Sequence, residues 1–380
     1  MNQLIRDRLL LNMIPGVGPR MYQKLLERFG DAGNALMASE QELRSVSGLG
    51  AKLAGTILDA KLHLDVTQEL EDCERYEVKI FTLEDPEYPA ELKQIADPPP
   101  ILYCKGELRE TDRLAIGVVG SRHLSDYGAK TANQFGRGLA QCGFTIVSGL
   151  ARGADAAAHK AALSAGGRTI AVLGSGILNM YPPEHKDLAA EISVNGAVIS
   201  EMPLHRPPHA GAFPQRNRIV SGLSLGVLVV EASSRSGALI TARHAMEQGR
   251  EVFAIPGRID SRTSQGCNDL IRDGAKLVQS IDDILEELGP LTQPVTRVVK
   301  PEIGRADTTA EVVTTIRQPA ELQLNDQEQA ILQAISVEPT LVDLIVQKTG
   351  LPVSRVLATL SVLQARRLIR RISGNQVARV

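Results

Sequence analysis

The amino-acid sequence predicts an α/β protein with a Rossmann-like, doubly wound and mostly parallel sheet, placed between a helical N-terminal domain and a C-terminal winged helix. Three observations support this prediction. Short, continuously apolar runs alternate with helical stretches between Leu114 and Gly257, which is typical of parallel strands buried on both faces. Residues 1–75 have helical patterns around two glycine-containing turns, and residues 325–380 have three helical segments followed by a hairpin.

The N-terminal domain, residues 1–75, contains a short internal repeat. The segment IPGVGPR at Ile14–Arg20 recurs as VSGLGAK at Val46–Lys52, and each copy lies between amphipathic patterns, as in a SAM-like helix-hairpin-helix. Glycines permit a tight turn and leave the first N–H groups of the next helix free. These groups can hold a phosphate, with added charge from Arg20 or Lys52, or each copy is only a structural turn. The sequence leaves both interpretations open.

Residues 76–288 contain the predicted core. Its first part, residues 76–113, is rich in proline and reads as an extended lead-in packed on a neighbouring domain. The runs that we interpret as parallel strands are LAIGVV, FTIVS, TIAVLG, GAVIS, GVLVVEA and EVFAIPG.

Small residues follow the predicted strands at the edge where ligands of an open parallel sheet bind. These loops are Gly120–Arg122, Gly149–Gly153, Gly174–Gly176 and Ser233–Gly237, and three of them carry an arginine. Small residues let a ligand approach the backbone, and helix N-termini together with guanidinium groups favour phosphate oxygens. The edge is therefore predicted to bind an anion.

The C-terminal part begins with a Pro- and Thr-rich segment, residues 289–324, that has no helical period and indicates a linker. Helices are predicted over Asp326–Ser336, Leu341–Lys348 and Val353–Arg366, and a hairpin is predicted around Gly374–Asn375. Three helices and a small hairpin describe a winged helix at residues 325–380.

The composition is that of a globular protein with little net charge. Its 42 Lys and Arg nearly balance 44 Asp and Glu, so a nucleic-acid site requires local clustering of basic groups. The four cysteines are far apart and form no C-x-x-C pair, which argues against a disulfide scaffold or a structural zinc site. Neither a signal peptide nor a membrane-spanning run is recognisable. We expect a cytoplasmic protein with reduced thiols.

Motifs for cofactors and for catalysis are weak. A complete G-x-G-x-x-G fingerprint and a Walker loop are both missing, so we expect no nucleotide cofactor. Asp155 and His159 are one helical turn apart, but an aspartate at a helix start is more often a cap than a catalytic group. His205 and His209 flank two prolines and lack the helical register of a metal pair, so no metal is expected.

Several motifs together resemble the DNA-processing protein A (DprA/Smf) family, over a stretch from Tyr88 to Val278. They are YPAELKQIADPPPILYCKG, VGSRHLSDYG, VSGLARGADAAAH, TIAVLGSGILNMYPPEHKDL, SEMP, FPQRNRIVSGLS, VVEASSRSGALITARHAMEQGREVFAIPG and GCNDLIRDGAKLV.

This resemblance implies a protein that binds single-stranded DNA without established catalysis. It implies that the protein protects incoming DNA during natural transformation, loads the RecA recombinase and forms a homodimer, with single-strand-binding protein as a further possible partner. By motif, Arg122 of GSR is the leading DNA contact and Lys186 of PPEHKDL the second. The family more often has Asn-Lys where this chain has His185-Lys186.

From the loops and the resemblance we predict one phosphate-binding groove. Its DNA-binding residues are expected to be Gly120, Ser121, Arg122, Ser148, Gly149, Arg152, Gly153, Lys186, Phe213, Arg216, Asn217 and Arg218. Secondary DNA contacts are expected at Arg20, Lys52, Arg366 and Arg367, and dimer contacts at Leu270 and Ile271. The chain has no Trp and 3% aromatic residues, so contacts to the DNA backbone are expected to dominate over base stacking.

Two other functions remain open. A nucleotide phosphoribohydrolase uses the same kind of sheet with a catalytic Glu, for which Glu231 is the candidate, although the glycine-rich motif of those enzymes is absent. A duplex-binding regulator could use its winged helix, where Arg366, Arg367, Arg370 and Arg371 are basic.

Overall fold

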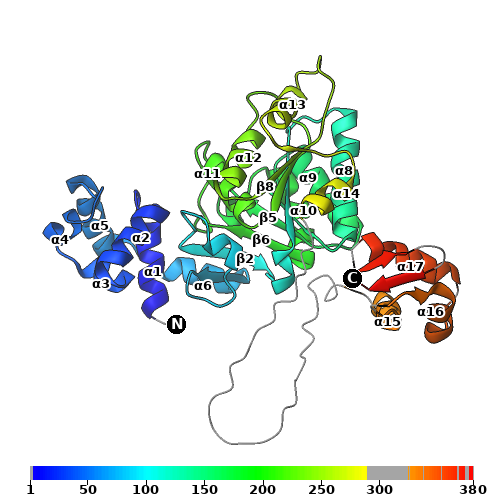
Figure 1. Cartoon of the computed structure of the whole chain (residues 1–380). Coiled ribbons are helices and arrows are strands. Elements are labelled where there is room, and N and C mark those ends of the chain that lie inside the picture. The colour runs from blue at the N-terminus through cyan, green and yellow to red at the C-terminus, as the bar shows by residue number, and fades with distance from the viewer. Residues whose placement is uncertain are drawn as a thin grey trace, which may run out of the picture. The chain divides into compact units, whose positions relative to one another are not determined.

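The computed structural model describes residues 3–288, 324, 326–336, 338–351, 353–365, 368–372 and 376–379. The chain forms two compact units, Met1–Gln279 and Ser280–Val380. The first unit contains the N-terminal helices and the large sheet (Figure 1). No described helix is long and apolar enough to cross a membrane.

Six helices precede the sheet, and residues of the first five form a separate hydrophobic core around Leu25, Leu43 and Ile57. They are α1 (Gln3–Met13), α2 (Pro19–Phe29), α3 (Ala32–Met37), α4 (Glu40–Arg44), α5 (Ala51–His63) and α6 (Thr67–Arg75).

The sequence repeat is also a structural repeat. Gly16 and Gly48 occupy equivalent turns and have φ angles of 93° and 90°, which a residue with a Cβ rarely adopts. Gly18 and Gly50 then precede α2 and α5 as N-caps without a side-chain hydrogen bond. The predicted helix-hairpin-helix turns are therefore confirmed as structure.

One sheet of nine strands lies at the centre of the first unit. Its strand order is β1-β2-β6-β5-β4-β3-β7-β8-β9, and β3 to β9 are mutually parallel. The parallel strands are β3 (Ala115–Val119), β4 (Thr145–Ser148), β5 (Thr169–Leu173), β6 (Gly196–Ser200), β7 (Gly226–Val229), β8 (Glu251–Ala254) and β9 (Lys276–Leu277). The six strands predicted from the apolar runs are all present.

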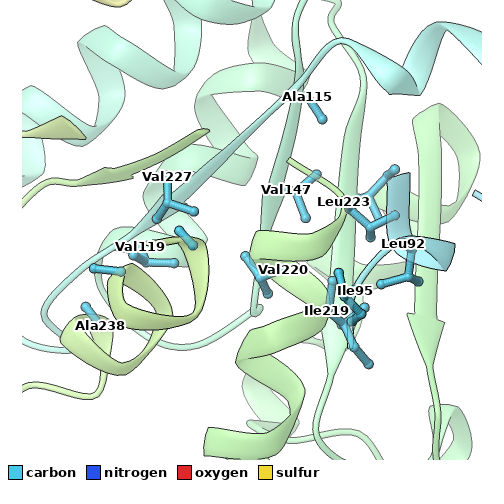
Figure 2. Packing of buried hydrophobic residues seen from close by; sticks show 14 of the residues in the cluster. Leu92, Ile95, Ala115, Val119, Val147, Ile219, Val220, Leu223, Val227 and Ala238 are labelled. Atoms are coloured by element: carbon cyan, nitrogen blue, oxygen red, sulfur yellow. The ribbon is translucent and has the colours of Figure 1, made fainter. Parts of the chain in front are cut away.

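Helices cover both faces of this sheet. One hydrophobic core joins it to α7, α11 and α12, and another joins it to α6, α9 and α10. Figure 2 shows Ile219 and Val220 of α11, with Leu223 just after that helix, in the first of these cores, beside Leu92 and Ile95. Between β1 and the end of the first unit, the α-helices are α7 (Ala90–Lys93), α8 (Asp126–Gln141), α9 (Ala154–Ser164), α10 (Lys186–Asn195), α11 (Ala212–Gly222), α12 (Ala238–Glu247) and α13 (Gln265–Arg272).

The lead-in differs from the expected extended segment because it adds two strands to the sheet. β1 (Val78–Thr82) pairs antiparallel with β2 (Ile101–Gly106), and β2 pairs antiparallel with β6. The packing that the sequence predicted for this segment is therefore achieved by strand pairing at the sheet edge.

The second unit contains α14 (Ile281–Glu287) and the fold of a winged helix. Its three-stranded sheet has the order β10-β12-β11, with the core residues Ile345, Val356 and Leu360. The elements are α15 (Asp326–Ala334), β10 (Thr340–Leu341), α16 (Val342–Thr349), α17 (Val353–Ala365), β11 (Ile369–Arg371) and β12 (Gln376–Arg379). Most of the predicted linker and the predicted Gly374–Asn375 turn lie outside the described residues.

Candidate nucleic-acid interface

A cleft of about 790 Å³ opens at the carboxyl edge of the parallel strands. It lies where the strand order reverses: β3 pairs with β4 on one side and with β7 on the other, and such a switch point is the usual ligand site of an open α/β sheet. The loop after β3, the loop after β7 and the start of α11 line the cleft. We refer to this feature as the cleft.

Glycines hold the cleft loops close together. A Cβ on Gly120 would lie 2.7 Å from the Cβ of Ala154, and Gly153 has a φ of 76° beside the carbonyl of Ser121. The backbone N–H groups of Ser121 and Ala154 donate to the carbonyls of Glu231 and Ser121, respectively. These contacts hold the backbone of the loop after β3 in place, and with it the position from which the Arg122 side chain extends.

Arg122, Phe213, Tyr181 and Arg152 form a row, and the first three of these residues line the cleft. The Arg122 guanidinium carbon lies 5.9 Å from the centre of the Phe213 ring. The Phe213 and Tyr181 rings are tilted by 53° with centroids 5.8 Å apart, and Arg152 lies 5.8 Å from the Tyr181 centroid. Such a guanidinium–aromatic row offers both charge for phosphates and ring faces for bases.

The two arginines at the ends of this row differ in their availability. Arg152 is ion-paired with Glu184. Arg122 is exposed, and within the described part of the chain it makes no ion pair. Arg122 is therefore the guanidinium best placed to accept an anion in the cleft.

Arg216 lies at the cleft as predicted for a groove residue, but it is buried and not open. Although it borders the cleft, it is only 4% exposed. Its Nη1 donates to the carbonyl of Gly149 at 2.7 Å and also to that of Val172. Burial lowers the pKa of Arg216 to about 10, against the opposing charge of Asp155. Through Nη1 the guanidinium ties the ends of β4 and β5 together.

Arg218 contradicts the prediction more completely. Its side chain is 7% exposed and forms a two-pronged ion pair with Glu201, at 3.0 and 2.6 Å, with Asp97 3.5 Å from its Nε. It borders a different pocket, next to Arg20 and Lys24. Two carboxylates already neutralise it, so it is a structural ion-pair residue of the first unit.

Five further predicted contacts do not line the cleft: Ser148, Gly149, Arg152, Gly153 and Lys186. Ser148 is buried and its hydroxyl donates to the carbonyl of Val118, while Gly149 is packed against the Arg216 guanidinium. Lys186 is exposed, but it borders another hollow together with Lys105. The groove predicted as continuous is therefore divided. Of the predicted groove residues, those that line the cleft are Gly120, Ser121, Arg122, Phe213, Arg216 and Asn217.

The two acidic groups near the cleft are held by hydrogen bonds. Buried Asp155 accepts from the backbone N–H of Gly149 at 3.0 Å and of Ala151 at 3.3 Å. Burial raises the pKa of Asp155, and the charge of Arg216 opposes that effect. The alternative catalytic Glu231 is 2% exposed and accepts from the N–H and hydroxyl of Ser125. Both carboxylates shape loops around the cleft.

His159 is a buried neutral imidazole. Its Nδ1 lies 2.6 Å from the hydroxyl of Thr169, which itself donates to the carbonyl of Ile146, so Nδ1 carries the proton. Burial lowers the pKa of His159 to about 3, helped by the positive charges of His185 and Arg216. Its Nε2 has no partner among the described residues. Asp155 and His159, whose one-turn spacing was weighed as a weak catalytic signal, are thus not hydrogen-bonded to each other.

The other predicted residues lie away from the cleft. Arg20 is exposed at the start of α2, 3.9 Å from Asp97, and Lys52 is exposed on α5. Leu270 and Ile271 are half-buried and pack against the core of the sheet. Arg366 and Arg367 lie outside the described residues. His205, considered for metal binding, has its Nε2 2.8 Å from the carboxylate of Asp72.

Several cleft residues were missed by sequence reasoning. Tyr181, His123 and His209 line the cleft and were not among the predicted contacts, whereas Ser233, Ser236 and Gly237 belong to the Ser233–Gly237 loop that was predicted at this edge. Tyr181 was within the quoted TIAVLGSGILNMYPPEHKDL motif, and an exposed aromatic residue after a parallel strand was the available signal. His209 follows a proline pair in a long loop, where no sequence pattern indicates which way a side chain points.

Comparisons with known proteins agree with this geometry. Residues 79–289 match the family model for DNA recombination-mediator protein A, residues 316–375 a DprA winged helix domain, and residues 8–60 a SAM-like helix-hairpin-helix tandem. The chain is 37% identical to Protein Smf of Synechocystis over 97% of both chains.

Solved structures give the same result. The X-ray structure of DNA processing protein A from Streptococcus pneumoniae aligns with a TM-score of 0.67 at 37% identity, covering 74% of this chain and 97% of that one. A DprA structure from Helicobacter pylori, described for its single-stranded DNA binding mode, aligns with a TM-score of 0.50 at 32% identity, covering 55% and 95%. The sequence motifs, the glycine-bound cleft and these matches together show that the chain belongs to the DprA/Smf family of DNA-processing proteins.

Proposed function

We propose that this protein binds single-stranded DNA in the cleft, with Arg122 as the principal phosphate contact. The observation that supports this most is the row from Arg122 through Phe213 and Tyr181 to Arg152 at the switch point of the sheet. A flexible single strand can present phosphates to the guanidinium groups and unstacked bases to the rings, whereas a duplex keeps its bases stacked inside.

The charged groups available at the cleft determine the DNA affinity that we expect. Arg122 is unpaired among the described residues, and Arg152 must compete with Glu184 for a phosphate. One to two phosphate contacts correspond to a log–log salt slope of about −0.7 to −1.4 for a single strand. Binding by one protomer is therefore expected to be weak and only moderately dependent on salt.

The test is fluorescence anisotropy with a labelled oligothymidylate at several KCl concentrations. Arg122→Ala should weaken binding and reduce the magnitude of the salt slope by about 0.7. The matched control is Arg137→Ala, an exposed arginine near the C-terminal end of α8, which lies toward the opposite edge of the sheet. Equal affinity of the Arg122→Ala variant and the unmodified chain would refute the proposal.

Because the contacts are to phosphates, they carry no sequence information. Loss of affinity in Arg122→Ala should therefore be similar for thymine-, cytosine- and adenine-rich strands of equal length. A loss confined to one base composition would show that Arg122 reads bases, and would contradict the phosphate role.

In the cell, we propose that the protein protects incoming single strands during natural transformation and passes them to RecA, as a homodimer in the cytoplasm. The support is membership of a recombination-mediator family. Strand exchange by RecA on DNA precoated with single-strand-binding protein tests this role: the intact chain should shorten the lag, and Arg122→Ala should not. An unchanged lag with the intact chain would contradict it.

The winged helix is proposed as an accessory module. Arg370 is exposed on β11, and a truncation after Leu288 removes this module while leaving the first compact unit, Met1–Gln279, whole. If the module binds duplex DNA, the truncated chain should lose affinity for duplex but keep its affinity for single strands. Equal duplex affinity would assign the module to protein contacts.

A further inference from the structure

A second hollow, separate from the cleft, lies between α10 and the β2–β6 part of the sheet. It has a volume of about 250 Å³, and its floor is apolar, with Leu178, Met180 and Val198 contributing. Lys105 from β2 and Lys186 from the start of α10 also line it, and none of its lining residues is a carboxylate. We call this feature the second hollow.

The charges of the second hollow are unbalanced. Lys105 is half-buried and Lys186 is exposed, and neither makes an ion pair with any described residue. In contrast, Arg218, Arg168 and Arg113 of the same unit each pair with a carboxylate. Two ammonium groups above an apolar floor are complementary to a ligand that joins an anion to a flat apolar ring.

The second hollow is adjacent to the cleft. Leu178 and Met180 line the hollow, whereas Tyr181, the next residue in the chain, lines the cleft. The segment Leu178–Tyr181 therefore contributes residues to both. A strand held against the Tyr181 ring has only this short segment to cross before it reaches Lys186.

We infer that the second hollow binds one further nucleotide of the same DNA strand, with its base on the apolar floor and its phosphate between Lys105 and Lys186. This inference rests on the proposed function of the cleft. The assignment of Lys105 is the new element, since this residue was not among the predicted DNA contacts although it lies within the YPAELKQIADPPPILYCKG motif. With this nucleotide, the surface that contacts the DNA strand, here called the track, extends beyond the cleft.

The experiment compares a short and a long oligothymidylate, about 4 and about 16 nucleotides, which span the usual site sizes of single-strand-binding folds. Lys105→Gln should bind the short probe as tightly as the unmodified chain. On the long probe it should bind roughly three- to tenfold more weakly, and the magnitude of its salt slope should fall by about 0.7.

The matched control is Lys79→Gln. Lys79 is exposed on β1 and pairs in register with Cys104, the neighbour of Lys105, so its side chain points to the opposite face of the sheet. A second variant, Ala190→Phe, fills the hollow from α10 without a change in charge. It should also weaken only the long probe and leave the thermal midpoint nearly unchanged.

The outcomes separate the two proposals. If Lys105→Gln and Ala190→Phe bind both probes like the unmodified chain, the second hollow is not part of the track and only this inference fails. Equal weakening on both probes would likewise overturn it, because it would place Lys105 at the cleft. If the unmodified chain binds neither probe, the proposed function fails and this inference fails with it.

Discussion

The two arginines that border the cleft should respond in opposite ways to the same substitution. Arg216→Met removes a buried guanidinium that holds the carbonyls of Gly149 and Val172 and offsets the buried charge of Asp155. Arg122→Met removes an exposed guanidinium that lies over the Phe213 ring. Stability should therefore depend on Arg216, and DNA affinity on Arg122.

The expected loss of stability depends on the groups that each substitution leaves without a partner. Removing one partner of a buried charge pair costs about 3–5 kcal/mol, because the other charge stays buried without compensation. At about 2–4 °C per kcal/mol for a unit of this size, Arg216→Met should lower the thermal midpoint by roughly 6–20 °C. Arg122→Met should change the free energy of unfolding by no more than about 0.5 kcal/mol, as for most exposed positions.

Circular dichroism at rising temperature measures the first quantity, since the chain has no Trp for intrinsic fluorescence. Anisotropy with oligothymidylate below the lower of the two midpoints measures the second. The double variant Asp155→Asn/Arg216→Met should recover part of the lost stability, because Asn keeps an acceptor for the backbone N–H groups without the charge. An Arg216→Met variant with unchanged midpoint and abolished DNA binding would refute this assignment of roles.

Three further predictions follow from the same geometry. Tyr181→Ala should weaken binding of single strands by about 1–3 kcal/mol while Tyr181→Phe keeps the affinity; equal affinities in an anisotropy titration would remove the ring from the site. Glu231→Gln should destabilise the protein by about 1–3 kcal/mol in thermal melts, because an amide cannot accept all three hydrogen bonds from Ser125 and Thr263; release of free base from a nucleotide by the unmodified chain, lost in Glu231→Gln, would instead support an enzyme. His159 has a pKa lowered from 6.5 to about 3, so its contribution to stability is complete above pH 6.5 and is lost as the pH falls toward 3, by roughly 3 kcal/mol at pH 4.5. Urea titrations from pH 7 to 4.5 should show a smaller decrease in His159→Gln, and identical pH profiles would contradict a neutral buried imidazole.

The sequence predicted the parallel strands well because burial on both faces leaves a continuous apolar run, which is local information. The two helix-hairpin-helix turns were also predictable from local information, because Gly16 and Gly48 repeat at equivalent positions of the sequence. In the structure both glycines have a φ near 90°. The strands β1 and β2 were missed because ILYCKG follows three consecutive prolines and VKIFT is short. Pairing of these two strands depends on contacts with each other and with β6, which sequence periodicity does not encode.

The error over Arg216 and Arg218 has a different origin. Both belong to α11, near the cleft, and a pair of arginines on such a helix is equally compatible with exposed and buried guanidinium groups. The acceptors of Arg216 are backbone carbonyls at the ends of β4 and β5, and the partner of Arg218 is Glu201 just after β6. These partners meet the arginines only after the sheet has formed, so no local pattern distinguishes a structural arginine from a binding one.

This division of roles has a consequence for how the protein can hold DNA. If Arg216 and Arg218 are occupied internally, each cleft has Arg122 and a partly engaged Arg152 for phosphates. Few contacts per protomer give low intrinsic affinity, whereas sites linked on one flexible strand gain strongly from effective concentration. Tight binding to long strands must then come from several protomers, or from the cleft and the second hollow acting together. Affinity should therefore rise steeply with oligonucleotide length, and a length-independent affinity would mean that the cleft alone makes all of the contacts.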